Sequence, residues 1–519
     1  MYFTVFSPRC CIVIPFVLPA ADFFFFTRES HVVILPPLCY NFRIILTHEK
    51  AKKEGQSPVK RQKRALCAVL SCILVVVLCT SCGMSGKEVR EKADAVTSSV
   101  EKITPADRPP VSSVELDGSE AAGDYSYNTV DGMSGRIKSS YDRLQTTHGY
   151  DALTDEDERY FYQRLESDVY IVTDEPSDSG EYLIDKIYLP GANLGEDKLR
   201  LVIEAFTNDH PEIFWLANVF GYTRSGSDQI VQMYSILSAQ DIEQYSRQIE
   251  QEVKSIVSSL PAGLNEYNRE LYLHDALLKK CAYASDVKKI EQDYRPFTLY
   301  GALVENRAVC EGYTKAMQYL LSFAGIESIP VNGTANGDWH QWNLVKINGC
   351  WYHLDATWDD SDNYIFYDYF NITDFTLKYD HEKARDFTEL SYDEICGTSG
   401  VPAQMFNIGI PRCIETNDSF YRHAAVYLYG FDEESTNIVE TALLETVSGH
   451  KNEFYIQVSN SIDYQETVDG LFYTEPYQFF QYLEDVNSLL GSTKIDENNV
   501  SIIKKERLRI VEVRLNYTS

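Results

Sequence analysis

The stretch between residues 339 and 358 constrains the fold more than any other part of this 519-residue chain. Two runs rich in aromatic and β-branched residues flank Asn348-Gly349. An Asn-Gly pair in that setting is the strongest short signal for a β-hairpin with a two-residue type I′ turn. The turn places Ile347 opposite Cys350, and each step outward pairs the next two residues. The sequence therefore predicts an antiparallel hairpin of fixed register.

This register brings a histidine and a carboxylate onto one face of the hairpin. Trp342 is expected to face Asp355, and His340 is expected to face Thr357. Directly opposed residues share a face, and so do alternate residues along one strand. His340 and Asp355 are then diagonal neighbours about 7–8 Å apart at Cα, within reach of a hydrogen bond between their side chains. A slip of one residue would put them on opposite faces.

Cys310 stands where a buried helix is expected to begin. Apolar residues recur at helical spacing from Cys310 to Ala324, and Gly325 follows where a left-handed C-cap residue is common. At a helix start, the helix dipole and the free N–H groups favour the thiolate, which is the nucleophilic form. The alternative interpretation is a small, inert core cysteine.

A thiol, an imidazole and a carboxylate are the three groups that nucleophilic acyl transfer requires. The thiolate attacks a carbonyl, the imidazole takes and returns a proton, and the carboxylate fixes the imidazole tautomer. We therefore predict that Cys310, His340 and Asp355 are catalytic. The Cys310 N–H is the expected first donor of an oxyanion hole. Tyr300 and Trp339 are candidates for its second donor or for the wall of the cleft.

Two other histidines have to be weighed against His340. His353 also falls on the Asp355 face and is the alternative general base. We prefer His340 because it lies near the open end of the hairpin, whereas His353 lies nearer the turn. His274 is interpreted as a packed or surface histidine on a helix.

The charge of the chain excludes some partners. The formal net charge of −30 would repel the phosphates of a nucleic acid. Asp359, Asp360 and Asp362 lack the spacing of a calcium-binding loop and are interpreted as a solvated acidic turn. We expect no metal and no cofactor.

The N-terminal part is predicted to contain an export signal. The basic stretch 60–64 precedes an apolar run over residues 65–78, and small residues lead to Cys82. This pattern is typical of a secretory signal, and the run is short for a membrane span. It resembles a bacterial lipoprotein signal in which Cys82 is lipidated, although Cys79 stands where that pattern prefers leucine. An uncleaved signal anchor is the alternative. Both interpretations place the remainder outside the cytoplasmic membrane.

Composition divides the chain further. Five scattered cysteines follow residue 82, which is too few for a disulfide framework. Residues 1–58 fit no export signal and are interpreted as an upstream translation artefact or a disordered stretch, with the true start at Val59. The expected parts are then a signal at 59–82, a flexible tether at 83–140, an α/β region at 141–249, a catalytic core at 250–385 and a small α+β domain at 395–519.

Four short motifs carry a resemblance to a known family. They are Tyr-Gly-Ala-Leu-Val at 300–304, Val-Cys-Glu-Gly-Tyr at 309–313, His-Gln-Trp-Asn at 340–343 and Trp-Tyr-His-Leu-Asp-Ala-Thr-Trp at 351–358. They resemble bacterial transglutaminase-like domain proteins over about residues 250–385. The resemblance implies an α+β fold with a papain-like core, in which a helix bearing Cys310 packs on an antiparallel sheet bearing His340 and Asp355. Gln341 departs from the alanine that family members often carry, but it should point away from the His340 face. Calcium dependence is not carried over.

The expected activity is thiol-dependent acyl transfer. Cys310 would form a thioester with a peptide or protein acyl group and pass it to an amine, as in cross-linking, or to water, as in a protease or deamidase. The expected substrates are extracytoplasmic peptides or proteins, those of the cell wall among them. The alternative is a non-catalytic scaffold or binding lipoprotein on the cell surface. We expect attachment to the membrane through the N-terminal lipid or signal and no nucleic-acid partner.

Overall fold

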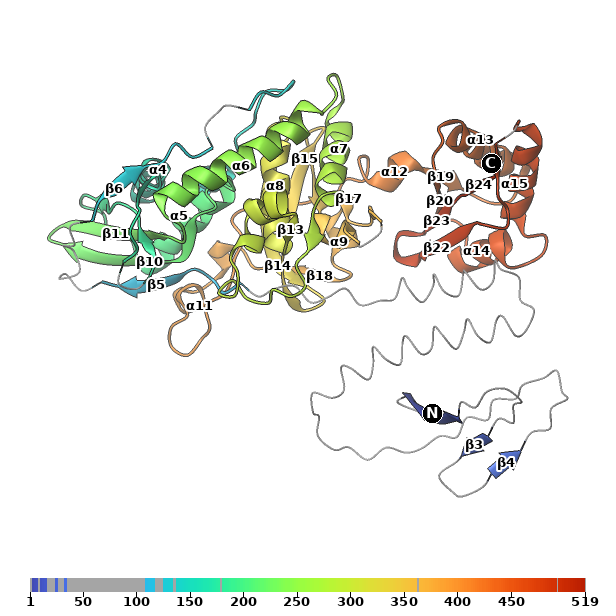
Figure 1. The fold of residues 1–519 in the computed structure, drawn as a ribbon, viewed down its shortest axis with the longest axis horizontal. Coiled ribbons are helices and arrows are strands. Elements are labelled where there is room, and N and C mark those ends of the chain that lie inside the picture. Colours follow the sequence, from blue (N-terminus) through green and yellow to red (C-terminus); the bar gives the residue numbers. More distant parts are fainter. Residues whose placement is uncertain are drawn as a thin grey trace. The chain divides into compact units, whose positions relative to one another are not determined.

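The computed structural model describes residues 108–116, 125–133, 137–177, 180–361, 364–491 and 493–518, together with four short strands near the N-terminus (Figure 1). These strands are β1 (Tyr2–Ser7) paired with β2 (Cys10–Pro15), and β3 (Phe24–Phe26) paired with β4 (Val32–Ile34). The expected signal at 59–82, with Cys82, lies outside the described residues. One compact unit spans Lys102–Ala424, and another includes Ala425–Ser519. Within the described ranges no helix is both long and apolar enough to cross a membrane.

The first part of the larger unit is built on a five-stranded sheet. Its strands are β5 (Ser112–Glu115), β10 (Leu216–Ser225), β11 (Asp228–Ser235), β8 (Tyr182–Leu183) and β9 (Ile187–Leu189), the last two both pairing with β11. A separate pair joins β6 (Tyr127–Thr129) to β7 (Ile171–Thr173). The helices are α3 (His148–Ala152), α4 (Glu156–Asp168) and α5 (Glu196–Asp209).

Part of the stretch 83–140 is folded, which corrects the expected flexible tether. β5 runs parallel to β10, with Val114 opposite Gly221. β6 runs antiparallel to β7. The partners of both strands come from later in the chain, so the polar composition of residues 83–140 alone carried no sign of them.

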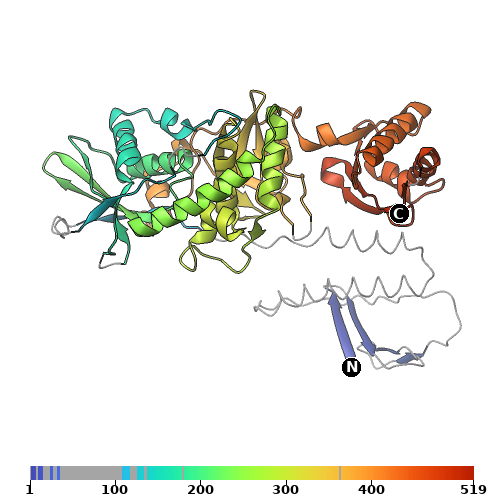
Figure 2. The same cartoon turned by 45° about the horizontal axis from the view of Figure 1, so that its top comes forward.

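The second part of the larger unit is a five-stranded antiparallel sheet with a helix on one face. The strand order is β17 (Phe370–Ile372), β16 (Cys350–Leu354), β15 (Asp338–Ile347), β14 (Ser328–Ala335) and β18 (His381–Lys383). Helix α8 (Cys310–Ser322) packs against β14 and β15 (Figure 1 and Figure 2). This mixture of helices and sheets agrees with the expected α+β class.

This unit also contains elements outside its two five-stranded sheets and α8. They are α6 (Ala239–Ser258), α7 (Glu266–Leu278), β12 (Ala282–Tyr283), η1 (Arg295–Phe297), the π-helical turn η2 (Gly301–Glu305), β13 (Arg307–Ala308), α9 (Ala356–Asp359), α10 (Asp374–Leu377), η3 (Phe387–Glu389), α11 (Tyr392–Cys396) and α12 (Phe420–Ala424).

The predicted hairpin is present, and its register near the turn is confirmed. Asn348 and Gly349 both have positive φ angles, 51° and 82°, as a type I′ turn requires. Ile347 faces Cys350, and the pairing continues to Asn343 opposite Leu354. The ladder ends there. The expected pairs beyond Leu354 do not form because the chain leaves the strand to begin α9.

Two glycines allow close packing around α8 and β14. A Cβ at Gly312 would lie 2.3 Å from the carbonyl oxygen of Pro296, so a side chain would push η1 away from the first turn of α8. A Cβ at Gly333 would lie 2.7 Å from the Trp342 ring and 2.3 Å from the Glu382 carbonyl oxygen. Both contacts are too short for any residue but glycine.

A buried carboxyl group on α7 makes this unit sensitive to pH. Burial raises the pKa of Glu270 from 4.5 to about 8, although a hydrogen bond from Asn371 Nδ2 at 2.7 Å and the nearby His274 oppose this. Its Oε1 atom is buried without a hydrogen-bond partner among the described residues. The folded protein therefore holds this proton more tightly than the unfolded chain does.

We expect Glu270→Gln to remove a loss of stability at alkaline pH. The stability that the Glu270 proton supplies is complete below pH 4.5 and is lost as the pH rises through about 8. The variant should match the parent near pH 4.5 and exceed its free energy of unfolding by roughly 2–4 kcal/mol at pH 9. Denaturant unfolding followed by tryptophan fluorescence measures this, because all five tryptophans lie between residues 215 and 358. The same difference at both pH values would contradict it.

The second compact unit contains a four-stranded sheet and three helices. The sheet order is β19 (Ala425–Leu428), β20 (Glu453–Val458), β23 (Ile510–Arg514) and β22 (Ser501–Lys505), with β19 parallel to β20 and the other pairs antiparallel. The other elements are α13 (Glu433–Ser448), α14 (Tyr464–Phe472), α15 (Gln478–Leu489), η4 (Glu506–Leu508) and the pair β21 (Lys494–Ile495) with β24 (Tyr517–Thr518). Val439, Leu443, Ile456 and Phe479 belong to its buried core.

This unit begins about thirty residues later than the expected boundary at 395. Cys413 lies in the apolar core of the larger unit. The Cys413 N–H donates to Asp374 Oδ2 at 3.1 Å, and its carbonyl accepts from the Asp374 N–H at 2.8 Å. These contacts attach the chain before Ala425 to α10, which follows β17 of the sheet that carries His340.

Candidate active site

Cys310 is the first residue of α8, as expected. Val309 is the N-cap in an extended conformation, so the chain enters the helix at the cysteine. The residue is 0% exposed, and the N–H groups of Gln341 and Glu311 both face its sulfur. Burial raises the pKa of the Cys310 thiol, and the two N–H groups offset this effect only in part. The N–H group at the helix start thus favours the thiolate in the expected direction, but burial outweighs it.

His340 and Asp355 are in direct contact. The His340 Nε2 atom lies 2.7 Å from Asp355 Oδ2, and both side chains are buried. The other carboxylate oxygen, Oδ1, accepts hydrogen bonds from the N–H groups of Thr357 at 3.0 Å and Trp358 at 3.1 Å. Asp355 is thus both the partner of His340 and the N-cap of α9. Burial opposes its ionisation, but His340 and His381 hold the pKa of Asp355 far below its ordinary value.

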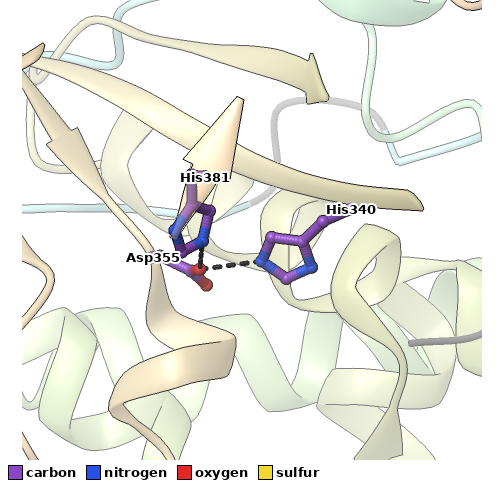
Figure 3. Close-up of side chains that lie close together, drawn as sticks. All are labelled: His340, Asp355 and His381. Atoms are coloured by element: carbon purple, nitrogen blue, oxygen red, sulfur yellow. Dashed lines mark hydrogen bonds and ion pairs between the residues drawn. The ribbon is translucent and has the colours of Figure 1, made fainter. Parts of the chain in front are cut away.

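Sequence reasoning missed His381, which joins the pair from β18 (Figure 3). Its Nε2 atom lies 3.0 Å from the same Asp355 Oδ2 atom that His340 contacts. The contact spans 26 residues of chain, and β18 has only three residues. A histidine beside Asp380 in an irregular stretch carries no periodic signal that could have revealed it.

His353, the alternative general base, lies elsewhere. Its Nε2 atom is 3.0 Å from Asp374 Oδ1, and its Nδ1 atom accepts a hydrogen bond from Trp342 Nε1 at 2.9 Å. Both ring nitrogens are therefore engaged away from Asp355. Of the two histidines on the hairpin, only His340 reaches the Asp355 carboxylate.

The two candidates for the oxyanion hole differ in their surroundings. The Tyr300 ring stacks on Tyr245 at 4.1 Å, and its hydroxyl donates to Gln248 Oε1 at 3.1 Å. The Trp339 Nε1 atom is buried without a hydrogen-bond partner among the described residues. Trp339 also shares a strand face with Asn343, whose side chain donates to the Thr314 carbonyl of α8 at 3.1 Å. These contacts favour Trp339 over Tyr300 as a donor near the start of α8.

The acidic stretch after Asp355 is structural and not a solvated turn, which corrects the expectation for two of its three residues. Asp359 is 0% exposed, and its Oδ1 atom accepts from the Tyr369 N–H at 3.0 Å. Its Oδ2 atom lies 3.5 Å from His274 Nε2, and His274 is itself buried. Asp360 accepts a hydrogen bond from the Tyr313 hydroxyl. Asp362 lies outside the described residues.

A buried charge cluster lies beside the first turn of α8. Glu311 Oε1 accepts from Arg108 Nη1 at 2.7 Å and from Lys315 Nζ at 2.6 Å. Arg108 belongs to the stretch that was expected to be a tether. A cavity of about 40 Å³ opens next to these three side chains, and its lining does not include Cys310, His340 or Asp355. The two cations balance Glu311, which otherwise would raise the pKa of the Cys310 thiol further.

Two groups of described residues bring together side chains that can bind metals. In His340, Asp355 and His381, the two Nε2 atoms already share Asp355 Oδ2 at hydrogen-bond distances. The second group is His353, Asp374 and Cys413.

Neither group requires an ion. In the second, Lys383 Nζ donates to Asp374 Oδ1 at 2.7 Å, which places a positive charge where a cation would sit. Burial raises the pKa of the Cys413 thiol to about 12. Shared protons account for the contacts in the first group.

The comparison with protein families finds a match for part of this chain. Residues 255–356 match the model of the transglutaminase-like superfamily. This stretch is similar to transglutaminase-like domains. Cys310, His340 and Asp355 all lie within the matched residues, whereas His381 lies beyond them. The match supports the general expectation of a cysteine-dependent enzyme, and the transglutaminase-like domain covers only part of the chain.

Comparisons with solved structures and with curated proteins add little to this family match. The crystal structure of a TGase matches at 15% identity with a TM-score of 0.20, covering 34% of this chain and 52% of the other. A structure described as a candidate cysteine protease from Cytophaga hutchinsonii matches at 13% identity with a TM-score of 0.18, covering 35% of this chain and 68% of the other. The chain thus spans about half the length of the TGase structure. No curated protein matches this sequence.

Proposed function

We propose that this protein is a cysteine acyl-transfer enzyme that uses Cys310 as nucleophile, His340 as general base and acid, and Asp355 as the group that orients His340. The observation that carries the proposal is the 2.7 Å contact between His340 Nε2 and Asp355 Oδ2. The Cys310 sulfur faces the N–H of Gln341, the residue that directly follows His340. The position of Cys310 at the start of α8, next to Gln341 of β15, supports the assignment of Cys310 as the nucleophile.

The chemistry follows from the tautomer that Asp355 selects. With the proton on His340 Nε2 directed at Asp355, Nδ1 is the nitrogen that takes a proton from the Cys310 thiol. The sulfur attacks an amide carbonyl, the S–C bond forms, and the C–N bond breaks as His340 returns the proton to the leaving ammonia or amine. Water or an amine then attacks the thioester, and His340 accepts the proton of that nucleophile. The new C–O or C–N bond forms as the C–S bond breaks, and His340 returns the proton to the Cys310 sulfur.

The buried thiol gives His340 a specific task. Because burial raises the pKa of Cys310, the sulfur rests as a thiol, and proton transfer to a neutral His340 would accompany attack on the carbonyl. General-base help of this kind typically contributes about 10²–10⁴-fold to a rate. The Cys310 N–H and the Trp339 Nε1–H are the proposed oxyanion donors.

The acyl donors that we propose are extracytoplasmic peptides or proteins, those of the cell wall among them. A basic stretch, a short apolar run and Cys82 support export followed by lipid anchoring, with an uncleaved signal anchor as the alternative. A papain-like core is the expected context for the site. It agrees with the packing of α8 on the antiparallel sheet that carries His340.

The experiment that tests this function distinguishes three reactions of one acyl group on the purified protein. A glutamine-containing peptide is incubated with and without a fluorescent primary amine, and amine incorporation, ammonia release and peptide cleavage are measured. Incorporation indicates a transferase, ammonia release without amine indicates a deamidase, and cleavage indicates a protease. Products that form equally with the parent and with Cys310→Ala would overturn the proposal.

One observation favours a second candidate, a scaffold that keeps the domain without its chemistry. Cys310 is 0% exposed and its thiol is not activated by ionisation. An inert core cysteine would look the same in these two respects.

Alkylation of Cys310 separates the enzyme from the scaffold. Iodoacetamide is added at several pH values, and the modified cysteine is identified by mass spectrometry. We expect labelling of Cys310 to accelerate with pH and to slow by about tenfold or more in His340→Ala, because the imidazole that accepts the thiol proton is gone. A rate that His340→Ala leaves unchanged would favour the scaffold. His353→Ala provides the matched control, since His353 does not contact Asp355.

A further inference from the structure

His381 lies between two carboxylates. Its Nε2 atom is 3.0 Å from Asp355 Oδ2, and its Nδ1 atom is 2.7 Å from Asp380 Oδ1 (Figure 3 draws the first contact). The side chain is fully buried. The second oxygen of Asp380 accepts from the Tyr369 hydroxyl at 2.5 Å. The imidazole therefore cannot rotate without losing two hydrogen bonds to acidic groups.

The two contacts determine the charge of the ring. A neutral imidazole has a single N–H, so it can donate to only one of two carboxylates. Burial lowers the pKa of His381, but the hydrogen bonds to Asp355 and Asp380 outweigh burial and raise that pKa above its ordinary value. Asp355 stays ionised. His381 is accordingly an imidazolium that donates from both nitrogens.

Asp355 therefore divides its charge between two imidazoles. Its Oδ1 atom is occupied by the two N–H groups of α9, so His340 and His381 share Oδ2. The ring centroids of the two histidines are 5.4 Å apart. A positive charge at that distance disfavours a second one on His340. His381 balances the negative charge that would otherwise hold a proton on His340.

We propose that His381 is a positioning residue that anchors the Asp355 carboxylate and keeps His340 neutral in the resting protein. The proposal rests on the proposed function, because His381 acts through the base of that same site. Neutral His340 is the form that can accept the Cys310 proton. A series of hydrogen bonds thus sets both the orientation and the protonation of the base. It runs from Asp380 through His381 and Asp355 to His340.

The charged and titratable groups around His381 come from several elements. Asp355 caps α9, Asp380 precedes β18, and His340 lies on β15. His353 on β16 is farther away but within electrostatic influence, since His381 helps to lower its pKa. Tyr369 reaches the cluster through Asp380.

His381→Gln tests the proposal because glutamine can still donate one hydrogen bond but carries no charge. The pKa of His340 should rise by about one unit once the neighbouring cation is gone. Neutral His340 then becomes available only at higher pH, so the acid limb of the pH profile of kcat moves up by the same amount. At pH values below that limb, kcat of the variant should be about tenfold lower than that of the parent. One pKa unit changes the fraction of neutral His340 by a factor of ten. KM should stay close to its original value.

Two further variants guard against misfolding as an explanation. Asp380→Asn keeps the His381 ring but removes one of the carboxylates that stabilise its charge, so the acid limb should move in the same direction. His353→Gln removes another buried histidine from the same sheet and should leave the limb in place. If the limb stays within about 0.2 units in both His381→Gln and Asp380→Asn, or moves down, the proposal is overturned.

A direct titration distinguishes this result from failure of the proposed function. ¹⁵N-histidine NMR in a Cys310→Ala background gives the pKa of His340 without any turnover. A protein that shows no Cys310-dependent turnover would refute the acyl-transfer function. An unchanged His340 titration in His381→Gln would refute the role of His381 alone.

Discussion

Cys310→Ala is expected to reduce product formation by roughly 10⁴-fold or more, the largest effect of any single substitution in this protein. In the proposed mechanism the sulfur is the atom that bonds to the acyl carbon, and no other described side chain at the start of α8 offers a nucleophile that His340 could serve. Stability should change little, because the substitution removes one buried sulfur atom from an otherwise intact helix. Initial rates with the substrate identified by the peptide and amine experiment measure the effect.

The matched control is Cys413→Ala. Cys413 is also 0% exposed, and its pKa is also raised by burial, but it packs in the apolar core beside β14 and β15 and does not face Gln341. We expect this variant to retain activity within a few fold. An equal loss in both variants would show that the loss reflects packing, and a full rate in Cys310→Ala would remove the nucleophile from the proposed mechanism.

Asp355→Asn should be nearly as damaging, for a different reason. Asparagine can keep its oxygen on the N–H groups of Thr357 and Trp358, but its NH₂ group then faces both imidazoles. His340 would have to accept on Nε2 and carry its proton on Nδ1, the nitrogen that must receive the thiol proton. A wrong tautomer of this kind costs about 10⁴-fold in kcat. Losing the charge between two buried histidines should also lower the free energy of unfolding by about 3–5 kcal/mol.

Asp374→Asn separates the two effects. Asp374 pairs with His353 at 3.0 Å on the same sheet, and it does not contact His340. The variant should lose stability, while its kcat stays within about tenfold of the parent. Chemical denaturation and initial rates on the same preparations provide both numbers. If Asp355→Asn retained a kcat similar to that of Asp374→Asn, orientation of His340 by Asp355 would not contribute to catalysis.

Local rules recovered the parts of the site that are close in sequence. The Asn348-Gly349 turn determines the register of its own hairpin, because an Asn-Gly turn of two residues aligns the strands in only one way. That register predicted the contact between His340 and Asp355, even though the outermost pairs give way to α9. The helical spacing after Cys310 likewise placed the cysteine at the start of α8.

Such local rules could not predict contacts between segments that are distant in the sequence. β5 pairs with a strand that lies more than 100 residues later, and its own composition is that of a linker. β18 has three residues and reaches the site only by pairing with β14. Neither a short strand nor a single histidine produces a periodic pattern, so His381 was not predicted.

The sequence by itself determined the contact between His340 and Asp355 and the position of Cys310 at a helix start. Turn chemistry and helical periodicity act over a few residues and do not depend on the rest of the fold. The protonation of those residues was decided only by the tertiary structure. Burial keeps Cys310 a thiol against the effect of the helix start, and His381 arrives from a distant strand to share the Asp355 charge with His340. Desolvation and long-range charge depend on everything packed around a group, and a local pattern of residues does not contain that information.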